Sequence, residues 1–268
     1  MITREKRDNP ALQAGSGVMG MGLCYISMYR DVIYNIIEKI LREEMANMEK
    51  ASEEIARGVM YDKWIYVLGT GHSMLVAVEM FHRAGGLAKI YPMLDIAISP
   101  FSGATKSSMI ERLSGYADAL IEYYSPSEGD VLIVISNSGK NAVPVEASVL
   151  ARERGVSVIA ITSVEYSKKL EPENRYGKRL YEVADIVIDN KVPEGDAALE
   201  IRELGSKRIA PVSTIVNSFI AHSLEILAIE KLVKRGYEPE IWVSVNIPSG
   251  EDLNRMLLEK YKRSVKHL

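Results

Sequence analysis

Short apolar runs alternate along this chain with longer segments whose apolar residues recur at helical spacing. The runs are typical of buried strands, and we expect strands at 64–68, 88–94, 120–124, 131–135, 156–162, 186–189 and 241–245. The longer segments predict helices at 74–83, 109–117, 142–154, 207–235 and 251–261. Alternation of this kind indicates a parallel sheet with right-handed crossovers and helices on both faces. The pattern therefore predicts an α/β fold built on a doubly wound parallel sheet in three layers.

The same pattern divides the chain into four parts. We expect a disordered N-terminal extension, a long helix, an α/β domain, and a C-terminal helix with a tail, at 1–28, 29–60, 61–248 and 249–268. The apolar stretch inside the extension is interrupted by Gly20 and Gly22, which argues against a secretory signal. It is also too short to cross a bilayer, so no membrane association is predicted.

The helix at 29–60 is amphipathic, with Val32 and Ile36 on one face. Ile33 and Ile37 give it a second apolar edge, which is more than packing on one face of a sheet requires. We therefore expect this helix to join subunits into a homodimer or homotetramer. The alternative is that it only covers the sheet.

Two predicted strands end in turns of small polar residues directly before a helix. The first turn, 69–73, reads Gly-Thr-Gly-His-Ser, and the second turn, 136–141, reads Ser-Asn-Ser-Gly-Lys-Asn. Free backbone N–H groups and the helix dipole favour an anion at such a place, and hydroxyl groups add hydrogen-bond donors. Each turn alone is about equally well explained as an ordinary helix cap. Two of them at one edge of a parallel sheet favour a shared phosphate site, at the point where the topology reverses.

The two turns resemble those of the SIS (sugar isomerase) domain family. The first is similar to the family's G-x-G-x-S motif, here Gly69, Gly71 and Ser73. The second is similar to its S-x-S-G-x-[ST] motif, whose last position is Asn141 in this chain. Because the family usually has Ser or Thr there, one phosphate contact is expected from an amide. A Pro-Val-Ser-Thr run at 211–214 is similar to a later segment of the family.

The resemblance covers about residues 55–235 and implies the flavodoxin-like SIS fold and a phosphorylated sugar as ligand. Within the family, the chain is most similar to stand-alone phosphosugar-binding proteins with an Arg-Ala-Gly-Gly-Leu run, here 83–87, after the first helix. The sugar-phosphate-binding residues that we expect are Gly71, Ser73, Ser136, Asn137, Ser138, Asn141 and Lys106. For Lys106 the alternative is a solvated side chain, as is usual for a lone lysine.

Isomerisation between an aldose and a ketose needs a base that moves a proton between adjacent carbons. Our candidates for catalysis are Glu79, His222 and Glu200. Each has a plainer explanation: an i,i+4 ion pair with Arg83 for Glu79, a hydrogen-bonded core histidine for His222, and a surface charge beside Arg202 for Glu200. Heptose-phosphate isomerases of the family carry His and Glu where this chain has Glu79 and Arg83. The resemblance therefore does not imply the catalytic site of those isomerases, or any metal that this site binds.

The favoured function is an aldose–ketose isomerase that acts on a sugar phosphate. The alternatives are a non-catalytic phosphosugar sensor or regulatory module, and a lyase or etherase acting on an amino-sugar phosphate. A formal net charge of -3, without a basic stripe, gives no reason to expect nucleic acid. Neither a metal nor a cofactor is predicted, because no spacing matches a structural metal site and a dinucleotide fingerprint would need glycine at Met74. The single cysteine, Cys24, is typical of a protein of the reducing cytoplasm.

Overall fold

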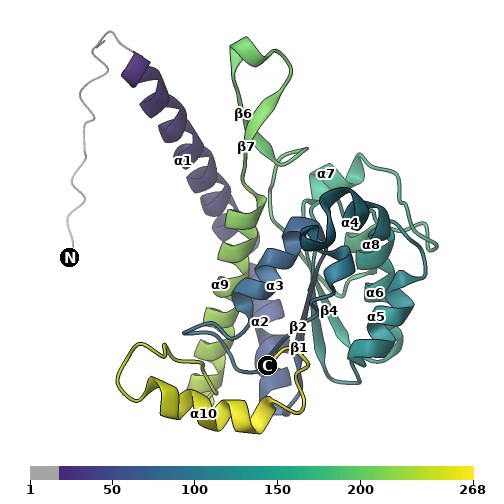
Figure 1. Cartoon of the computed structure of the whole chain (residues 1–268), viewed down its shortest axis with the longest axis vertical. Helices are drawn as coiled ribbons and strands as arrows, with labels where there is room; N and C mark the ends of the chain where they lie inside the picture. The colour runs from purple at the N-terminus through teal and green to yellow at the C-terminus, as the bar shows by residue number, and fades with distance from the viewer. Residues whose placement is uncertain (1–17) are drawn as a thin grey trace.

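The centre of the molecule is a five-stranded parallel sheet (Figure 1). The computed structural model describes residues 18–268. The strands of the sheet are β1 (Ile65–Gly69), β2 (Ile90–Pro92), β3 (Val131–Ile135), β4 (Ser157–Thr162) and β5 (Ile186–Asp189). They lie in the order β2-β1-β3-β4-β5, so the topology reverses between the neighbours β1 and β3. This is the flavodoxin-like order, and the predicted fold class is confirmed.

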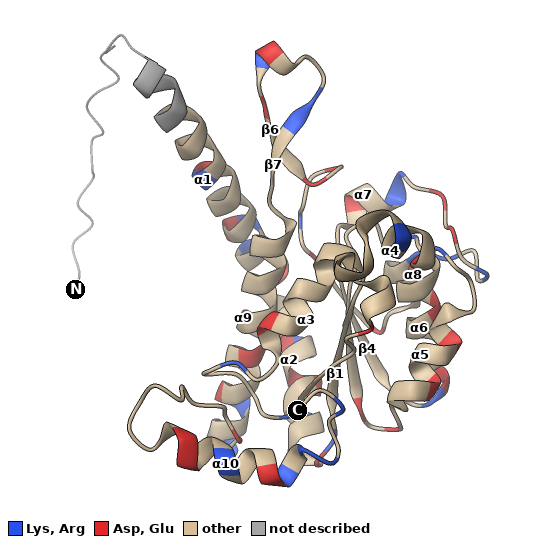
Figure 2. Cartoon of the chain, viewed as in Figure 1, with Lys and Arg blue, Asp and Glu red and all other residues tan. Residues whose placement is uncertain are grey.

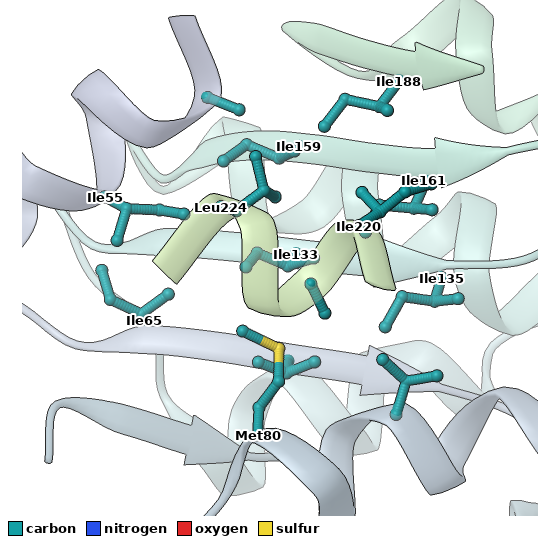
Figure 3. Close-up of a cluster of buried hydrophobic side chains, with 14 of the residues drawn as sticks. Ile55, Ile65, Met80, Ile133, Ile135, Ile159, Ile161, Ile188, Ile220 and Leu224 are labelled. Atoms are coloured by element: carbon teal, nitrogen blue, oxygen red, sulfur yellow. The ribbon is translucent and has the colours of Figure 1, made fainter. Parts of the chain in front are cut away.

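Side chains alternate between the two faces of the sheet and form a separate core on each. On one face, Ile133 and Ile159 pack with Ile55 and Leu224 of the covering helices (Figure 3). The helices of this face are α2 (Met45–Met60), α3 (Met74–Met80) and α9 (Ser213–Lys234). The helices of the opposite face are α5 (Tyr116–Tyr124), α6 (Ala142–Glu153) and α8 (Leu180–Val183). Strands buried on both faces read as continuous apolar runs, which is why the sequence shows them clearly.

Shorter elements complete the α/β domain and its C-terminal end. They are α4 (Ala104–Ile110), α7 (Val164–Lys168), α10 (Gly250–Tyr261), η1 (Gly71–Ser73), η2 (Ile96–Ile98), η3 (Pro100–Ser102) and η4 (Arg202–Leu204). Tyr261 at the end of α10 packs edge-on against Trp64, with 5.2 Å between ring centroids. Basic and acidic residues are interspersed along the elements of the chain (Figure 2). Among residues 18–268, no helix combines the length and the apolar character that crossing a membrane requires.

The segment between β2 and β3 differs from the prediction. The sequence predicts a helix at 109–117 and a strand at 120–124, but a turn separates α4 from α5, and the apolar run belongs to α5. The buried residues of α5 follow helical spacing: Ala117, Leu120, Ile121 and Tyr124. A short apolar run does not by itself distinguish a strand from a buried helix. The strand predicted at 241–245 is wrong too, because Ile241 makes only an isolated bridge with Leu87.

The helix predicted at 207–235 begins later than expected. The residues before α9 form β7 (Arg208–Pro211), which pairs antiparallel with β6 (Ala197–Glu200) in a hairpin that projects from the body (Figure 1). Asp196 explains where the helix begins. Its carboxylate accepts the backbone N–H groups of Val212 at 3.1 Å and Ser213 at 2.7 Å, which satisfies donors that a helix leaves free at its amino end.

The single helix predicted at 29–60 is two helices, α1 (Val18–Glu43) and α2. They meet at Glu44, a buried residue. Its carboxylate accepts hydrogen bonds from Lys191 Nζ at 2.7 Å and from the backbone N–H of Asp189 at 3.3 Å. The break between the helices is therefore tied to the carboxyl end of β5.

Helix α1 starts inside the segment 1–28, which the sequence predicts to be disordered. Residues 18–28 are helical, so the prediction is wrong for them, whereas 1–17 lie outside the described part of the chain. The amino-terminal half of α1 extends beyond the sheet and its covering helices (Figure 1). Ile26 and Tyr34 on this helix are 68% and 61% exposed. The single chain thus leaves apolar side chains of α1 in solvent.

Candidate functional site

The first turn, 69–73, closes tightly at the carboxyl end of β1. A Cβ atom on Gly69 would lie 2.4 Å from the backbone carbonyl group of Ser73, so only glycine allows this approach. Gly71 has a φ of +54°, a left-handed conformation that favours glycine. The turn continues through η1 directly into α3. Two of the residues predicted to bind phosphate, Gly71 and Ser73, therefore belong to a turn with a fixed shape.

The second turn is held by its own side chains and by buried amides from distant segments. The hydroxyl oxygen of Ser136 accepts the N–H of Gly139 at 3.2 Å. Oδ1 of Asn137 accepts hydrogen bonds from the side-chain amides of Asn190 at 2.7 Å and Asn217 at 3.3 Å. Sequence reasoning missed these last two residues, because only the fold brings the end of β5 and helix α9 to this turn.

Glu111 joins the two turns, which emerge side by side because β1 and β3 are paired. Its Oε2 accepts the hydroxyl of Thr70 in the first turn at 2.6 Å. Its Oε1 accepts the side-chain amide of Asn141 in the second turn at 3.0 Å. Arg112 Nη1 lies 3.3 Å from the same Oε1. Sequence analysis missed Glu111, since an acidic residue in a polar segment carries no motif of its own.

The segment that follows α7 crosses the second turn. The backbone N–H of Glu173 and the side-chain amide of Asn174 both donate to the carbonyl oxygen of Lys140, at 2.9 Å and 3.0 Å. The Lys140 ammonium group is itself paired with the Glu173 carboxylate. Lys106, which we predicted to contact the ligand, lies exposed on α4, and α4 packs against the first turn.

Glu79 and His222, two of the predicted catalytic residues, are brought together by the packing of α3 against α9. Oε1 of Glu79 lies 3.3 Å from Nε2 of His222 and 3.2 Å from Nη2 of Arg83, so the ion pair with Arg83 that the sequence suggests is present. Glu225, which sequence reasoning missed, is 3% exposed and lies 3.3 Å from Nδ1 of His222. Its other oxygen accepts the backbone N–H of Leu87 at 3.0 Å. His222 and Glu225 line a surface pocket of about 330 Å³.

Two carboxylates flank the imidazole ring of His222. The hydrogen bond to Glu225 has the largest effect and raises the pKa of His222; burial opposes the rise, and the hydrogen bond to Glu79 adds to it. A protonated imidazole of this kind can act as a general acid. Glu79 follows Ser73 by six residues, which is about 9 Å of helix rise.

Glu200 does not join either group. It lies on β6 of the projecting hairpin (Figure 1), exposed to solvent, with Oε1 3.6 Å from Nη1 of Arg208. The segment before α9 turns back on itself as a hairpin, which gives Glu200 the position of a surface charge. A catalytic role for Glu200 stays a prediction.

A protein-family model described as "SIS domain" matches residues 28–163. The chain belongs to the SIS domain family. Related SIS proteins include a UPF0309 protein of Shouchella clausii, which is 35% identical over 92% of this chain and 100% of the relative. A UPF0309 protein of Brucella canis is 42% identical over 85% of this chain and 93% of the relative. The resemblance seen in the two turns is confirmed.

Two solved structures share the fold of this SIS protein. A phosphoheptose isomerase from Neisseria gonorrhoeae superposes with a TM-score of 0.53 and 16% identity, covering 77% of this chain and 97% of its own. A phosphoheptose isomerase from Francisella tularensis also has a TM-score of 0.53 and 16% identity, covering 78% of this chain and 98% of its own. At this level of identity the likeness concerns the fold alone.

Asn141 is the position at which this SIS domain departs from the family motif. Its amide group donates to Glu111, and its Oδ1 is buried without a hydrogen-bond partner among the described residues. One of the two N–H groups of this amide already has an acceptor, and a phosphate contact from the amide stays a prediction.

Proposed function

We propose that this protein binds a phosphorylated sugar, with the phosphate at the two turns. The observation that carries the proposal is the pair of glycine-containing turns at the adjacent carboxyl ends of β1 and β3. Ser73, Ser136 and Ser138 supply hydroxyl groups there. Open α/β sheets bind their ligands where the topology reverses. Membership of the SIS family, and phosphoheptose isomerases among proteins of the same fold, support a sugar phosphate as the ligand.

We further propose that the reaction is an aldose–ketose isomerisation carried out by Glu79 and His222. The Glu79 carboxylate takes the proton from C2 of the aldose, while His222 gives its proton to the carbonyl oxygen, and an enediol forms. Glu79 then returns the proton to C1, and His222 recovers a proton from the hydroxyl on C2. The 3.3 Å contact between the two side chains supports this assignment.

We also propose that the protein is a homodimer or homotetramer assembled through α1, and that it works in the cytoplasm. Ile26, Tyr34 and Leu41 of α1 are exposed, and Ile37 between them is half-buried. A partner subunit would remove these apolar side chains from water. The cytoplasm is proposed on the single cysteine, Cys24, which is exposed.

Binding and turnover assays test these proposals separately. Thermal-shift measurements with hexose, pentose and amino-sugar phosphates should identify a ligand, which at 100 times its dissociation constant adds about 2.7 kcal/mol to stability. An isomerase should then interconvert aldose and ketose, or exchange the hydrogen on C2 in deuterated water. A ligand that binds without turnover or exchange would favour the sensor, and release of a substituent from an amino-sugar phosphate would favour the lyase. If no sugar phosphate stabilises the protein, the binding proposal is wrong.

A further inference from the structure

Glu111 contacts both turns and the start of helix α6 as well. Its carboxylate accepts from Thr70 and Asn141, and its backbone carbonyl oxygen accepts the N–H of Val143 at 3.0 Å. Thr70 is 8% exposed and Asn141 is 5% exposed, so both donors are shielded from bulk water. Buried donors need an acceptor, and one carboxylate serves both.

The role of Asn141 shows that this arrangement replaces an ordinary helix cap. An asparagine that precedes a helix usually accepts the N–H of the second or third helical residue with its side-chain oxygen. Here the second residue of α6, Val143, donates to Glu111 instead, and the third residue, Pro144, has no N–H. Asn141 makes no side-chain cap, its Oδ1 has no partner in the described part of the chain, and its amide group points to Glu111.

We propose that Glu111 is a positioning residue that couples the two turns, so that the affinity of the site for phosphate depends on it. A carboxylate does not attract a phosphate, and Arg112, 3.3 Å away, offsets its charge. What Glu111 supplies is a rigid link, because its two oxygens fix the first turn relative to the second. The inference rests on the proposed phosphate site.

Substitutions of Glu111 separate geometry from charge. Glutamine keeps the link without the charge: its oxygen accepts from Asn141, and its amide donates to the Thr70 hydroxyl, which has lone pairs to accept. Alanine removes the link. By isothermal calorimetry with inorganic phosphate, we expect Glu111→Ala to weaken binding about ten-fold or more, as for loss of hydrogen bonds to a charged group. Glu111→Gln should stay close to the wild type, and so should the exposed control Glu122→Ala.

Two binding results would overturn the inference. If Glu111→Ala and Glu111→Gln both bind phosphate more tightly than the wild type, the carboxylate opposes the anion and does not prepare the site. If Glu111→Ala binds as the wild type does while Ser138→Ala is weakened, the phosphate site stands, and Glu111 has no part in it.

Hydrogen exchange tests the same link without a ligand. In Glu111→Ala, the hydrogen-bonded backbone amides of Ser73 and Gly139 should exchange faster than in the wild type, while those of β4 keep their rates; Glu111→Gln should restore protection. Unchanged exchange in both turns would refute the coupling, even in a protein that binds phosphate. If the wild type binds no phosphate, the proposed function fails, and the exchange rates alone decide whether Glu111 links the turns. A loss of protection in β4 as well would mean general destabilisation, which also contradicts a local role.

Discussion

Replacing Gly139 by alanine tests whether the second turn has the shape that the structure gives it. Gly139 has a φ of +57°, and a Cβ atom there would lie 3.0 Å from Thr162 Oγ1, 3.1 Å from Ser167 Oγ and 3.2 Å from Leu180 Cβ. The left-handed conformation costs an alanine about 1–2 kcal/mol. Crowding against three packed neighbours adds about 1–3 kcal/mol. We therefore expect Gly139→Ala to lower the free energy of unfolding by about 2–5 kcal/mol.

Gly177→Ala is a matched control that carries only one of the two costs. Gly177 has a φ of +58°, nearly the same as that of Gly139, but a Cβ atom there would meet nothing within 4 Å. We expect this variant to lose about 1–2 kcal/mol. The difference between the two variants then measures the crowding around the second turn.

Urea denaturation of both variants measures the free energies, provided that the m-value matches that of the wild type. Phosphate binding by calorimetry completes the comparison: Gly139→Ala should bind more weakly because its turn must shift, whereas Gly177→Ala should bind normally. Equal losses of stability in the two variants would refute the crowding argument. Normal binding by a destabilised Gly139→Ala protein would show that the shape of the turn does not determine affinity.

Four further changes test the remaining proposals. Ser138→Ala removes a donor to the phosphate, worth about 1.5–3 kcal/mol, so calorimetry should show weaker sugar-phosphate binding at an unchanged melting temperature. Ile37→Glu should yield monomers in sedimentation, because it places an unpaired charge in the interface; a monomeric wild type would end that proposal. Glu225→Gln should lower the pKa of His222 in an NMR titration. In the wild type, the raised pKa stabilises the fold below the unfolded-state pKa, and this stabilisation is lost as the pH rises through the folded-state pKa. Glu79→Gln should reduce turnover by orders of magnitude with little loss of binding, and full activity would move the base elsewhere.

The elements that could be predicted are those whose buried apolar side chains follow a regular pattern in the sequence. Strands β1, β3 and β4 are buried on both faces and read as continuous apolar runs, so their places follow from the sequence. The edge strand β5 is only partly buried, but it keeps a short apolar run. The run 120–124 also carries apolar residues, yet it lies in α5, because a short apolar run fits a buried helix as well as a strand. The hairpin before α9 was unpredictable for another reason: half of it, 208–211, is largely exposed and has no apolar pattern to read.

In the candidate site, residues that act through local contacts could be predicted, whereas residues that act through distant contacts could not. The two turns could be predicted, because glycine and small hydroxyl residues at the end of a strand are typical of a tight turn. Glu111, Asn190 and Glu225 could not, because each acts on a partner far along the chain; Glu225, for example, accepts the N–H of Leu87. Nothing in the sequence near such a residue distinguishes it from a solvated charge or amide.

Helix α3 connects the first turn with the cluster of Glu79 and His222. It begins where the first turn ends, so the residues that shape the turn also fix the direction in which Glu79 projects. Helix α9 supplies Asn217 to the second turn and His222 to the cluster with Glu79, and it therefore connects the same two places from the other side. In the proposed isomerase, these two helices would set the spacing between the phosphate and the reacting carbon, because side-chain motion changes helix geometry little.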